Sequence, residues 1–317
     1  MQSSSFVIII FGPTGVGKSD IAQSLASFLP IEIINMDVGQ FYAPLSIGTA
    51  KPAWQQSSIP HHLFDIIAEP KNITVAEYRD LVIDQVRTVW QHKKIPVLVG
   101  GSGFYLMSLF FPPEAAKTDQ VTQGTWQDLN ELDPARAAKI HPQDMYRIQR
   151  ALSIIKMTGR LPSLYQPHFD PIAPFIITEL VRERQDLYDR INGRTKVMMQ
   201  LGWQNEVEKL LNTEWELYLQ QKKLIGYDDI ISYLKSESDT RNYDQLIATI
   251  AQKTRHYAKR QLTFGRMLIA RLKEQYAFMQ SSKSSVEVFN LTLSDVDLYI
   301  NQLLHHPLVV NYQGKKE

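Results

Sequence analysis

The sequence contains no cysteine, and this absence excludes several kinds of site. None of the 317 residues has a thiol that forms a disulfide, binds zinc as a thiolate or acts as a nucleophile. Long apolar runs are also missing: no stretch reaches the roughly 20 residues of a membrane span, and the N-terminus lacks a basic segment followed by an apolar one. We therefore expect a cytoplasmic protein without a membrane anchor.

An excess of one charge sign is also absent from the chain as a whole. The formal net charge is +1, and 44% hydrophobic with 21% charged residues is typical of a globular protein. The basic residues are nevertheless clustered, because residues 251–273 contain seven Lys or Arg and no acid, and residues 136–160 contain six against Asp144 alone. Such runs indicate either anionic partners or solvated helix faces.

One glycine-rich stretch carries the first chemical signal. It follows the apolar run 6–11, precedes a helix-like segment and matches the pattern G-x-x-x-x-G-K-[ST]. Its residues are Gly12, Pro13, Thr14, Gly15, Val16, Gly17, Lys18 and Ser19. Glycines allow several backbone N–H groups to converge on one anion, while Lys18 adds a charge and Ser19 an oxygen for Mg²⁺. The pattern predicts a phosphate loop without specifying a nucleotide or another phosphate.

The apolar runs predict a parallel sheet. Residues 6–11, 31–36, 95–99 and 175–180 are expected to be buried strands, and Thr74 opens a helix with Glu77 at the capping-box spacing. We predict an α/β fold, a P-loop doubly wound parallel sheet with a mostly helical C-terminal part and a short inserted lobe. The expected parts are the first section of the core (1–110), the insertion (111–135), the rest of the core with a basic helical region (136–280) and a C-terminal strand and helix (281–317).

Asp37 directly follows the second predicted strand. Because ligands bind beyond the carboxyl ends of parallel strands, we expect its carboxylate to face the same crevice as the phosphate loop. The carboxylate would either hold Mg²⁺ through water, as in nucleotide hydrolases, or accept a proton from a nucleophile, as in a transferase. Its position alone does not choose between the two.

Several further motifs occur together in one order. They include Asp37-x-x-Gln40-x-Tyr42, Ile-Gly-Thr-Ala-Lys-Pro at 47–52, Val-Gly-Gly-Ser-Gly-x-Tyr-Leu at 99–106 and Arg-x-Tyr-Ala-Lys-Arg-Gln at 255–261. With the phosphate loop, they make the chain resemble the tRNA dimethylallyltransferases over nearly its whole length. The resemblance implies transfer of a dimethylallyl group from dimethylallyl diphosphate to N6 of the adenosine just 3′ of the anticodon, with release of diphosphate.

The resemblance also implies roles for particular residues. Thr14, Lys18 and Arg255 would stabilise the diphosphate leaving group together with Mg²⁺ near Ser19, and Asp37 would accept the N6 proton. The expected catalytic residues are therefore Asp37, Thr14 and Arg255. The tRNA anticodon stem-loop would contact Asp37, Val38, Gly39, Gln40, Ser102, Tyr146, Arg147, Ile148, Gln149, Arg150, Lys223, Gly226, Tyr227, Lys259 and Arg260. We expect a monomer without a protein partner.

The chain departs from the family pattern at a few places. Val38 stands where serine is usual, Gly265 where an aromatic residue is frequent, and the segment between Phe111 and Asp133 is shorter than the family's insertion. Two alternatives are a small-molecule kinase with ATP in the loop and a catalytically reduced RNA-binding relative. The absence of an Asn-Lys-x-Asp run counts against a GTPase.

Overall fold

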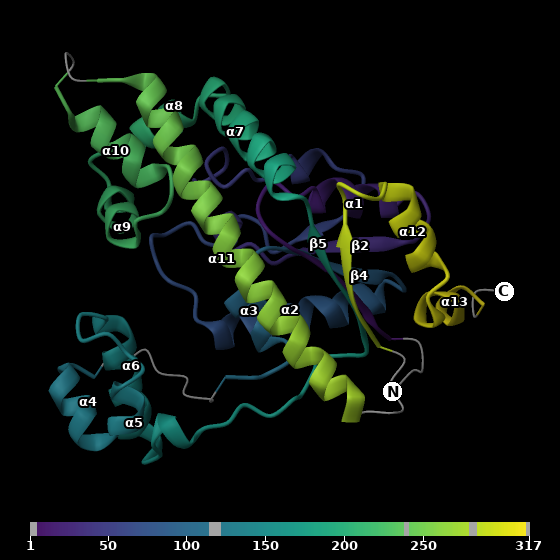
Figure 1. Ribbon diagram of the computed structural model, residues 1–317, viewed down its shortest axis with the longest axis horizontal. Helices are drawn as coiled ribbons and strands as arrows, with labels where there is room; N and C mark the ends of the chain where they lie inside the picture. The colour runs from purple at the N-terminus through teal and green to yellow at the C-terminus, as the bar shows by residue number, and fades with distance from the viewer. Residues whose placement is uncertain (1–4, 114–121, 238–240, 279–283, 315–317) are drawn as a thin grey trace. The chain divides into compact units, whose positions relative to one another are not determined.

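The computed structural model describes residues 5–113, 122–237, 241–278 and 284–314. Within it the chain forms two compact units (Figure 1). One unit comprises Met1–Met107 together with Ile172–Glu317, and the other comprises Ser108–Pro171. The first unit contains the sheet and the phosphate loop.

A six-stranded, all-parallel sheet forms the centre of the first unit. The strands are β1 (Val7–Phe11), β2 (Ile31–Asn35), β3 (His61–His62), β4 (Ile95–Gly100), β5 (Phe175–Val181) and β6 (Ser285–Asn290). Their order is β3-β2-β4-β1-β5-β6. The central strands are fully buried, as continuous apolar runs require when helices cover both faces of a sheet. The predicted α/β P-loop fold is confirmed.

Helices connect and cover the strands of this unit. They are α1 (Lys18–Leu25), α2 (Val75–Gln91), α3 (Gly103–Ser108), α7 (Arg184–Gln200), α8 (Trp203–Glu208), α9 (Glu214–Lys222), α10 (Tyr227–Lys235), α11 (Tyr243–Phe278), α12 (Val296–Leu304) and α13 (Pro307–Gln313). Thr74 and Glu77 form the predicted capping box of α2. Figure 1 shows the long helix α11 running beside α7, with which it packs.

Successive side chains along each strand point to opposite faces of the sheet. Ile8 and Ile10 of β1 share one hydrophobic core with Ile21 of α1 and Tyr299 of α12. Side chains at the other positions point to the opposite face, where Glu179 of β5 lies against Gly265 of α11. β6 is last in the strand order and pairs with β5 throughout its length, so the C-terminal strand forms an edge of the main sheet.

The second unit is a small helical lobe. It contains α4 (Trp126–Leu132), α5 (Pro134–Ala137), α6 (Met145–Thr158) and the 3₁₀ turn η3 (Pro162–Leu164) around a core of its own. It extends beyond the expected insertion at 111–135, because α6 packs on α4 and contributes half of the core residues. Residues 114–121 of that expected segment lie outside the described residues.

The helical spacing of apolar residues in the 133–159 segment does not correspond to one continuous helix. The structure breaks it between α5 and α6, where Pro142 precedes Asp144, and the Asp144 carboxylate caps α6 by accepting from the Arg147 N–H at 3.1 Å. Across the described ranges, no helix is long and apolar enough to span a membrane.

Candidate active site

The phosphate loop joins β1 to α1 with a backbone that only glycine accepts readily. Gly17 has φ of +111° at the start of α1, and a Cβ added to Gly12 would lie 2.4 Å from the Leu180 carbonyl oxygen. The Lys18 ammonium donates to the carbonyl oxygens of Gly12 and Pro13 at 3.0 and 2.9 Å. The loop is thus folded around its own lysine at the carboxyl end of the central strand.

Three arginines brace successive residues of the loop from one side. Arg182, after β5, donates from Nε to the Val16 carbonyl oxygen at 2.8 Å, and Arg190 of α7 donates to that of Gly15 at 2.9 Å. One helical turn further, Arg194 Nη1 lies 3.4 Å from the Thr14 hydroxyl oxygen. Three guanidinium groups therefore lie against a loop built to receive an anion, and one of them, that of Arg182, is paired with Asp186 at 2.8 Å.

Arg194 is the residue that sequence reasoning missed. No role was predicted for Arg194, or for Arg190 four residues earlier on the same helix face. Their i,i+4 spacing is the signal that could have found it, since residues so spaced on a helix share one surface. The position of α7 against the loop, by contrast, is a matter of tertiary packing.

Asp37 lies at the end of β2 and is held by Asn35. The Asn35 side chain accepts from the Asp37 N–H at 2.8 Å and donates to the Asp37 carbonyl oxygen at 3.1 Å and to that of Leu63 at 3.0 Å. The Asp37 carboxylate accepts from the Gly39 N–H at 3.3 Å. Asn35 is 1% exposed, so the backbone of Asp37 is fixed from within the core.

The electrostatics of the site couple Asp37 to the loop cations. Removal from water raises the pKa of the Asp37 carboxyl above its usual value, although Lys18, the Gly39 N–H and Arg194 oppose the rise. Burial likewise lowers the pKa of Lys18 to about 8, assisted by Arg194 and opposed by Asp37. A carboxylate with a raised pKa is a stronger proton acceptor than one in water.

The loop after β4 approaches the segment that contains Asp37. The Ser102 hydroxyl accepts from the Val38 N–H at 3.2 Å. Gln40 donates to the carbonyl oxygens of Thr49 and Ala50 at 3.1 and 3.3 Å, which ties the Ile-Gly-Thr-Ala-Lys-Pro loop to the same place. The structure thus brings together the sequence-predicted residues Asp37, Val38, Gln40 and Ser102, which come from different parts of the chain.

Other predicted RNA-contact residues differ in their exposure. Tyr227 is fully buried, and its hydroxyl donates at 2.7 Å to Glu206, which also accepts from the N–H groups of Ser46, Ile47 and Gly48. Gly226 packs so closely on Trp203 that a Cβ there would lie 1.9 Å from the indole ring. Tyr227 therefore supports the 46–48 loop from inside rather than offering an RNA-facing surface.

Within the helical lobe, the predicted contact residues of α6 also divide. Tyr146 and Arg147 are exposed, whereas Ile148 is buried in the lobe's core. Gln149 donates to the Gln123 side chain at 3.0 Å, and Arg150 is half-buried. In the other unit, Lys223, Lys259 and Arg260 are exposed.

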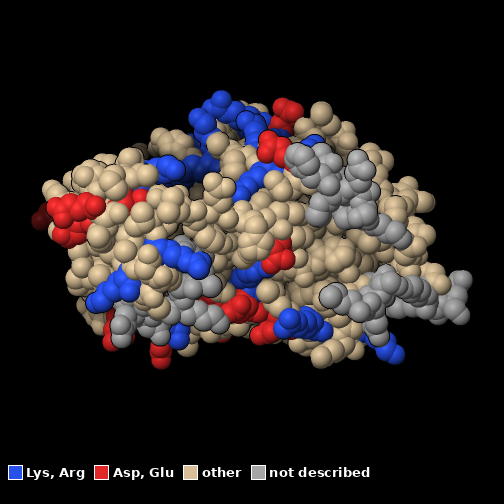
Figure 2. Space-filling model, turned by 90° about the horizontal axis from the view of Figure 1, so that it is seen from below, with Lys and Arg blue, Asp and Glu red and all other residues tan. Residues whose placement is uncertain are grey.

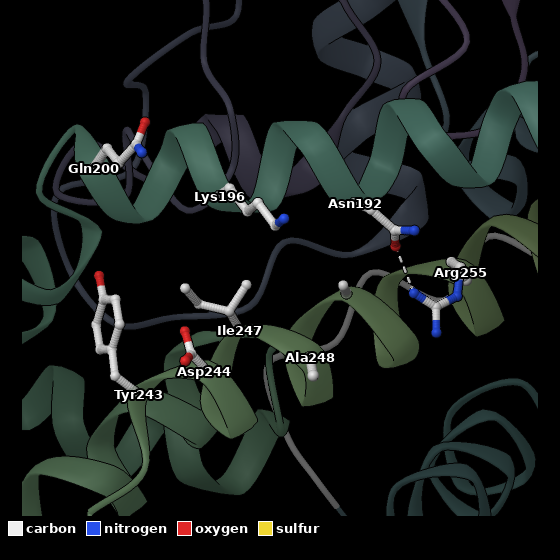
Figure 3. A pocket seen from close by; sticks show the side chains of 9 residues that line it. Asn192, Lys196, Gln200, Tyr243, Asp244, Ile247, Ala248 and Arg255 are labelled. Carbon is white, nitrogen blue, oxygen red and sulfur yellow. Dashed lines mark hydrogen bonds between the residues drawn. The ribbon is translucent and has the colours of Figure 1, made fainter.

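Arg255 is one of the residues that line a pocket between α7 and α11. Its Nη1 donates to Asn192 at 2.5 Å, and its guanidinium lies 5.7 Å from the centre of the Tyr188 ring (Figure 3). The pocket has a volume of about 720 Å³. Figure 3 shows the side chains that line it, which are Asn192, Lys196, Gln200, Tyr243, Asp244, Ile247, Ala248, Ala251 and Arg255. The arginine that contacts the Thr14 hydroxyl is therefore Arg194, whereas Arg255 contacts Asn192.

The face of the molecule drawn in Figure 2 carries charges of both signs. Figure 2 shows Lys and Arg in several separate groups on one face, with Asp and Glu between them. A polyanion would therefore meet local basic groups rather than a uniformly basic face.

The residues at the loop fit a magnesium ion that is held mainly by a bound phosphate. Ser19 is exposed in the first turn of α1, and its hydroxyl and the Asp37 carboxylate are oxygen donors of the kind that Mg²⁺ prefers. Among the described residues there is no group of three or more His, Cys, Asp or Glu side chains arranged to hold a metal. Such a donor set suits an ion whose remaining ligands are phosphate oxygens and water.

Comparison with known proteins agrees with this geometry. A family model described as IPP transferase matches residues 40–267, more than half of the chain. The chain belongs to the IPP transferase family. The tRNA dimethylallyltransferase of Lacticaseibacillus paracasei is 39% identical over 276 residues, covering 82% of this chain and 88% of the relative. That of Thermotoga maritima is 36% identical over 270 residues, covering 81% and 88%.

Solved structures extend the likeness to the fold. The full-length tRNA isopentenylpyrophosphate transferase of Bacillus halodurans is 30% identical, with a TM-score of 0.64 and coverage of 98% of both chains. A eukaryotic dimethylallyltransferase acting on tRNA is 26% identical, with a TM-score of 0.74 and coverage of 96% of this chain and 77% of that one. The resemblance stated from the motifs is thereby confirmed at the level of the family.

Proposed function

We propose that this enzyme, a prenyltransferase that acts on tRNA, transfers a dimethylallyl group from dimethylallyl diphosphate to N6 of the adenosine 3′-adjacent to the anticodon, and releases diphosphate. The observation that carries the proposal is that the cations of the phosphate loop and the partly buried Asp37 carboxylate lie within electrostatic range of one another. Thr14 and Lys18 belong to the loop and Arg194 of α7 contacts it, while the charges of Lys18 and Arg194 both act on the Asp37 carboxyl.

The loop side serves the leaving group. As the bond from the allylic carbon to oxygen breaks, negative charge grows on the diphosphate, where loop N–H groups, Lys18 and Arg194 stabilise it. The Thr14 hydroxyl is directed by Arg194 and donates to the departing oxygen. Mg²⁺, with Ser19 as its protein ligand, supplies further positive charge when bound.

The Asp37 side serves the nucleophile. An adenine amine is weakly nucleophilic and must lose a proton as the new bond to carbon forms, so a nearby carboxylate with a raised pKa is suited to accept that proton. The base has to leave its stack in the anticodon loop to reach the crevice. Gln40 and Ser102, which are joined to the Asp37 segment, would then contact its edges.

The RNA contacts and the remaining roles form part of the same proposal. We place phosphate contacts of the anticodon stem-loop on Tyr146, Arg147 and Arg150 and on the exposed Lys223, Lys259 and Arg260. Arg255 would contribute to diphosphate stabilisation from beside Asn192. A cytoplasmic location and a monomeric state stay predictions.

The direct test is mass spectrometry of nucleosides from unmodified tRNA incubated with the protein, dimethylallyl diphosphate and Mg²⁺. We expect one adenosine per substrate tRNA to gain one dimethylallyl group. A protein that leaves tRNA unchanged but transfers phosphate from ATP to a small molecule would establish the kinase alternative instead. Salt-dependent binding of the stem-loop without any product would establish a reduced RNA-binding relative.

A further inference from the structure

The side-chain amide of Gln261, near the middle of α11, makes two long-range hydrogen bonds. Its Oε1 accepts from the Thr14 backbone N–H at 2.9 Å, and its Nε2 donates to the Gly101 carbonyl oxygen at 2.8 Å. The bonded positions are 247 and 160 residues away in the chain. One planar group thus joins the loop after β1 to the loop after β4.

These two loops are the ones that the proposed function assigns to the two reactants. Thr14 belongs to the loop that holds the leaving group, and its hydroxyl lies beside Arg194. Gly101 directly precedes Ser102, whose hydroxyl accepts from the Val38 N–H next to Asp37. Gln261 therefore connects the donor side of the crevice to the acceptor side.

The packing around this bridge leaves little room for other arrangements. A Cβ on Gly101 would lie 2.4 Å from Gln261 Nε2 and 3.0 Å from the Gly12 carbonyl oxygen. One helical turn along α11, Phe264 is so close to Gly103 that a Cβ there would lie 2.3 Å from the ring. The helix face that carries Gln261 and Phe264 therefore fits directly against the 101–103 loop.

We propose that Gln261 is a positioning residue that sets the distance between the allylic carbon and the adenine N6, an inference that rests on the proposed function. Only glutamine has the required acceptor and donor on one rigid amide of this length, because ionised glutamate lacks the donor, and methionine lacks the donor and has only a weak acceptor in its sulfur. A displacement of about 1 Å between reacting groups costs on the order of 100-fold in rate. Loss of the bridge should therefore appear in kcat more than in the KM for either substrate.

The test compares Gln261→Met and Gln261→Glu with Gln252→Met, which makes the same change at an exposed position of α11. We expect kcat to fall by roughly 10- to 100-fold in both Gln261 variants, with each KM within about threefold of wild type, and Gln252→Met to match wild type. The carboxylate of Gln261→Glu can still accept from the Thr14 N–H, but it has no N–H to donate and is repelled by the Gly101 carbonyl oxygen. This variant therefore tests the bridge even where the methionine variant does not fold.

Hydrogen exchange at the Thr14 amide supplies a readout that does not depend on turnover. We expect faster exchange in Gln261→Met than in wild type and in Gln252→Met. Unchanged kcat in a folded Gln261 variant, or an effect confined to KM, would overturn the inference. A wild-type protein that forms no prenylated adenosine refutes the proposed function instead, and unchanged Thr14 exchange refutes the bridge on its own.

Discussion

Glu179 of β5 is a buried carboxyl group whose titration should make stability depend on pH. The residue is 2% exposed, and its Oε1 has no hydrogen-bond partner within the described ranges. Burial raises its pKa from 4.5 to about 7, while the charge of Arg266 opposes the rise. The neighbouring Gly265 leaves the space that the carboxyl occupies, since a Cβ there would lie 2.0 Å from Oε1.

The direction and the size of the effect on the free energy of unfolding follow from the pKa of Glu179 in the unfolded and folded states. Below pH 4.5 the group is protonated in the folded and unfolded states and has no effect. Between pH 4.5 and 7 the unfolded chain loses the proton first, so the free energy of unfolding falls as the pH rises and then stays lowered above 7. At about 1.4 kcal/mol per pKa unit, the free energy of unfolding falls by at most about 3 kcal/mol. Access of water to the carboxyl group reduces this fall towards about 1 kcal/mol.

Urea denaturation of wild type and Glu179→Gln at pH 5 and pH 8 measures this effect. We expect the two proteins to differ little at pH 5, and the variant to be more stable by about 1–3 kcal/mol at pH 8. Glu274→Gln, at an exposed position of α11, is the matched control and should leave the pH dependence unchanged. An equal difference between wild type and Glu179→Gln at both pH values would refute the reasoning.

Further substitutions test the site and the packing around it. Asp37→Asn should abolish prenyl transfer but leave binding of the donor, measured by calorimetry, within about threefold of wild type, because it removes the proton acceptor and keeps the shape. Arg194→Ala should lower kcat by roughly 100-fold in steady-state assays, as expected when one donor to a developing charge is lost; an effect on tRNA affinity alone would remove Arg194 from the reaction. Gly265→Ala should destabilise the protein by about 1–3 kcal/mol in urea, and Glu179→Ala in the same chain should restore part of the loss. Arg147→Ala should reduce the steepness with which tRNA binding falls with salt; an unchanged slope would place the stem-loop elsewhere.

The sequence predicted the parts of this fold that depend on local pattern. Continuous apolar runs identified β1, β2, β4 and β5, and the phosphate loop followed from its glycines and its place between a strand and a helix. The two-residue strand β3 carries too short a pattern to be recognised, and it was missed. The break between α5 and α6 was also missed, although Pro142 and the capping Asp144 indicate it.

Only those residues of the site that belong to a sequence motif or follow a predicted strand could be predicted. Asp37 followed from its position after a strand, but the role of Asn35 in holding it depends on a carbonyl oxygen 28 residues away, which no local pattern contains. Arg194 and Gln261 likewise meet Thr14 because α7 and α11 pack on one another beside the sheet. Side chains whose partners are distant in sequence are found by tertiary structure, unless a family motif already marks them.

Gly265 stands where an aromatic residue is frequent in the family, and the structure gives a physical reason for the glycine. Taken alone, glycine within a long helix lowers its stability by roughly 1 kcal/mol relative to alanine. In the structure, the same position faces the Glu179 carboxyl, and any larger side chain would collide with it. Gly265 and Glu179 are therefore one feature, a small residue on α11 that accommodates a large polar one on β5. Because Gly265 lies one helical turn beyond Gln261, this fit also determines how closely that part of α11 approaches the sheet beneath the phosphate loop.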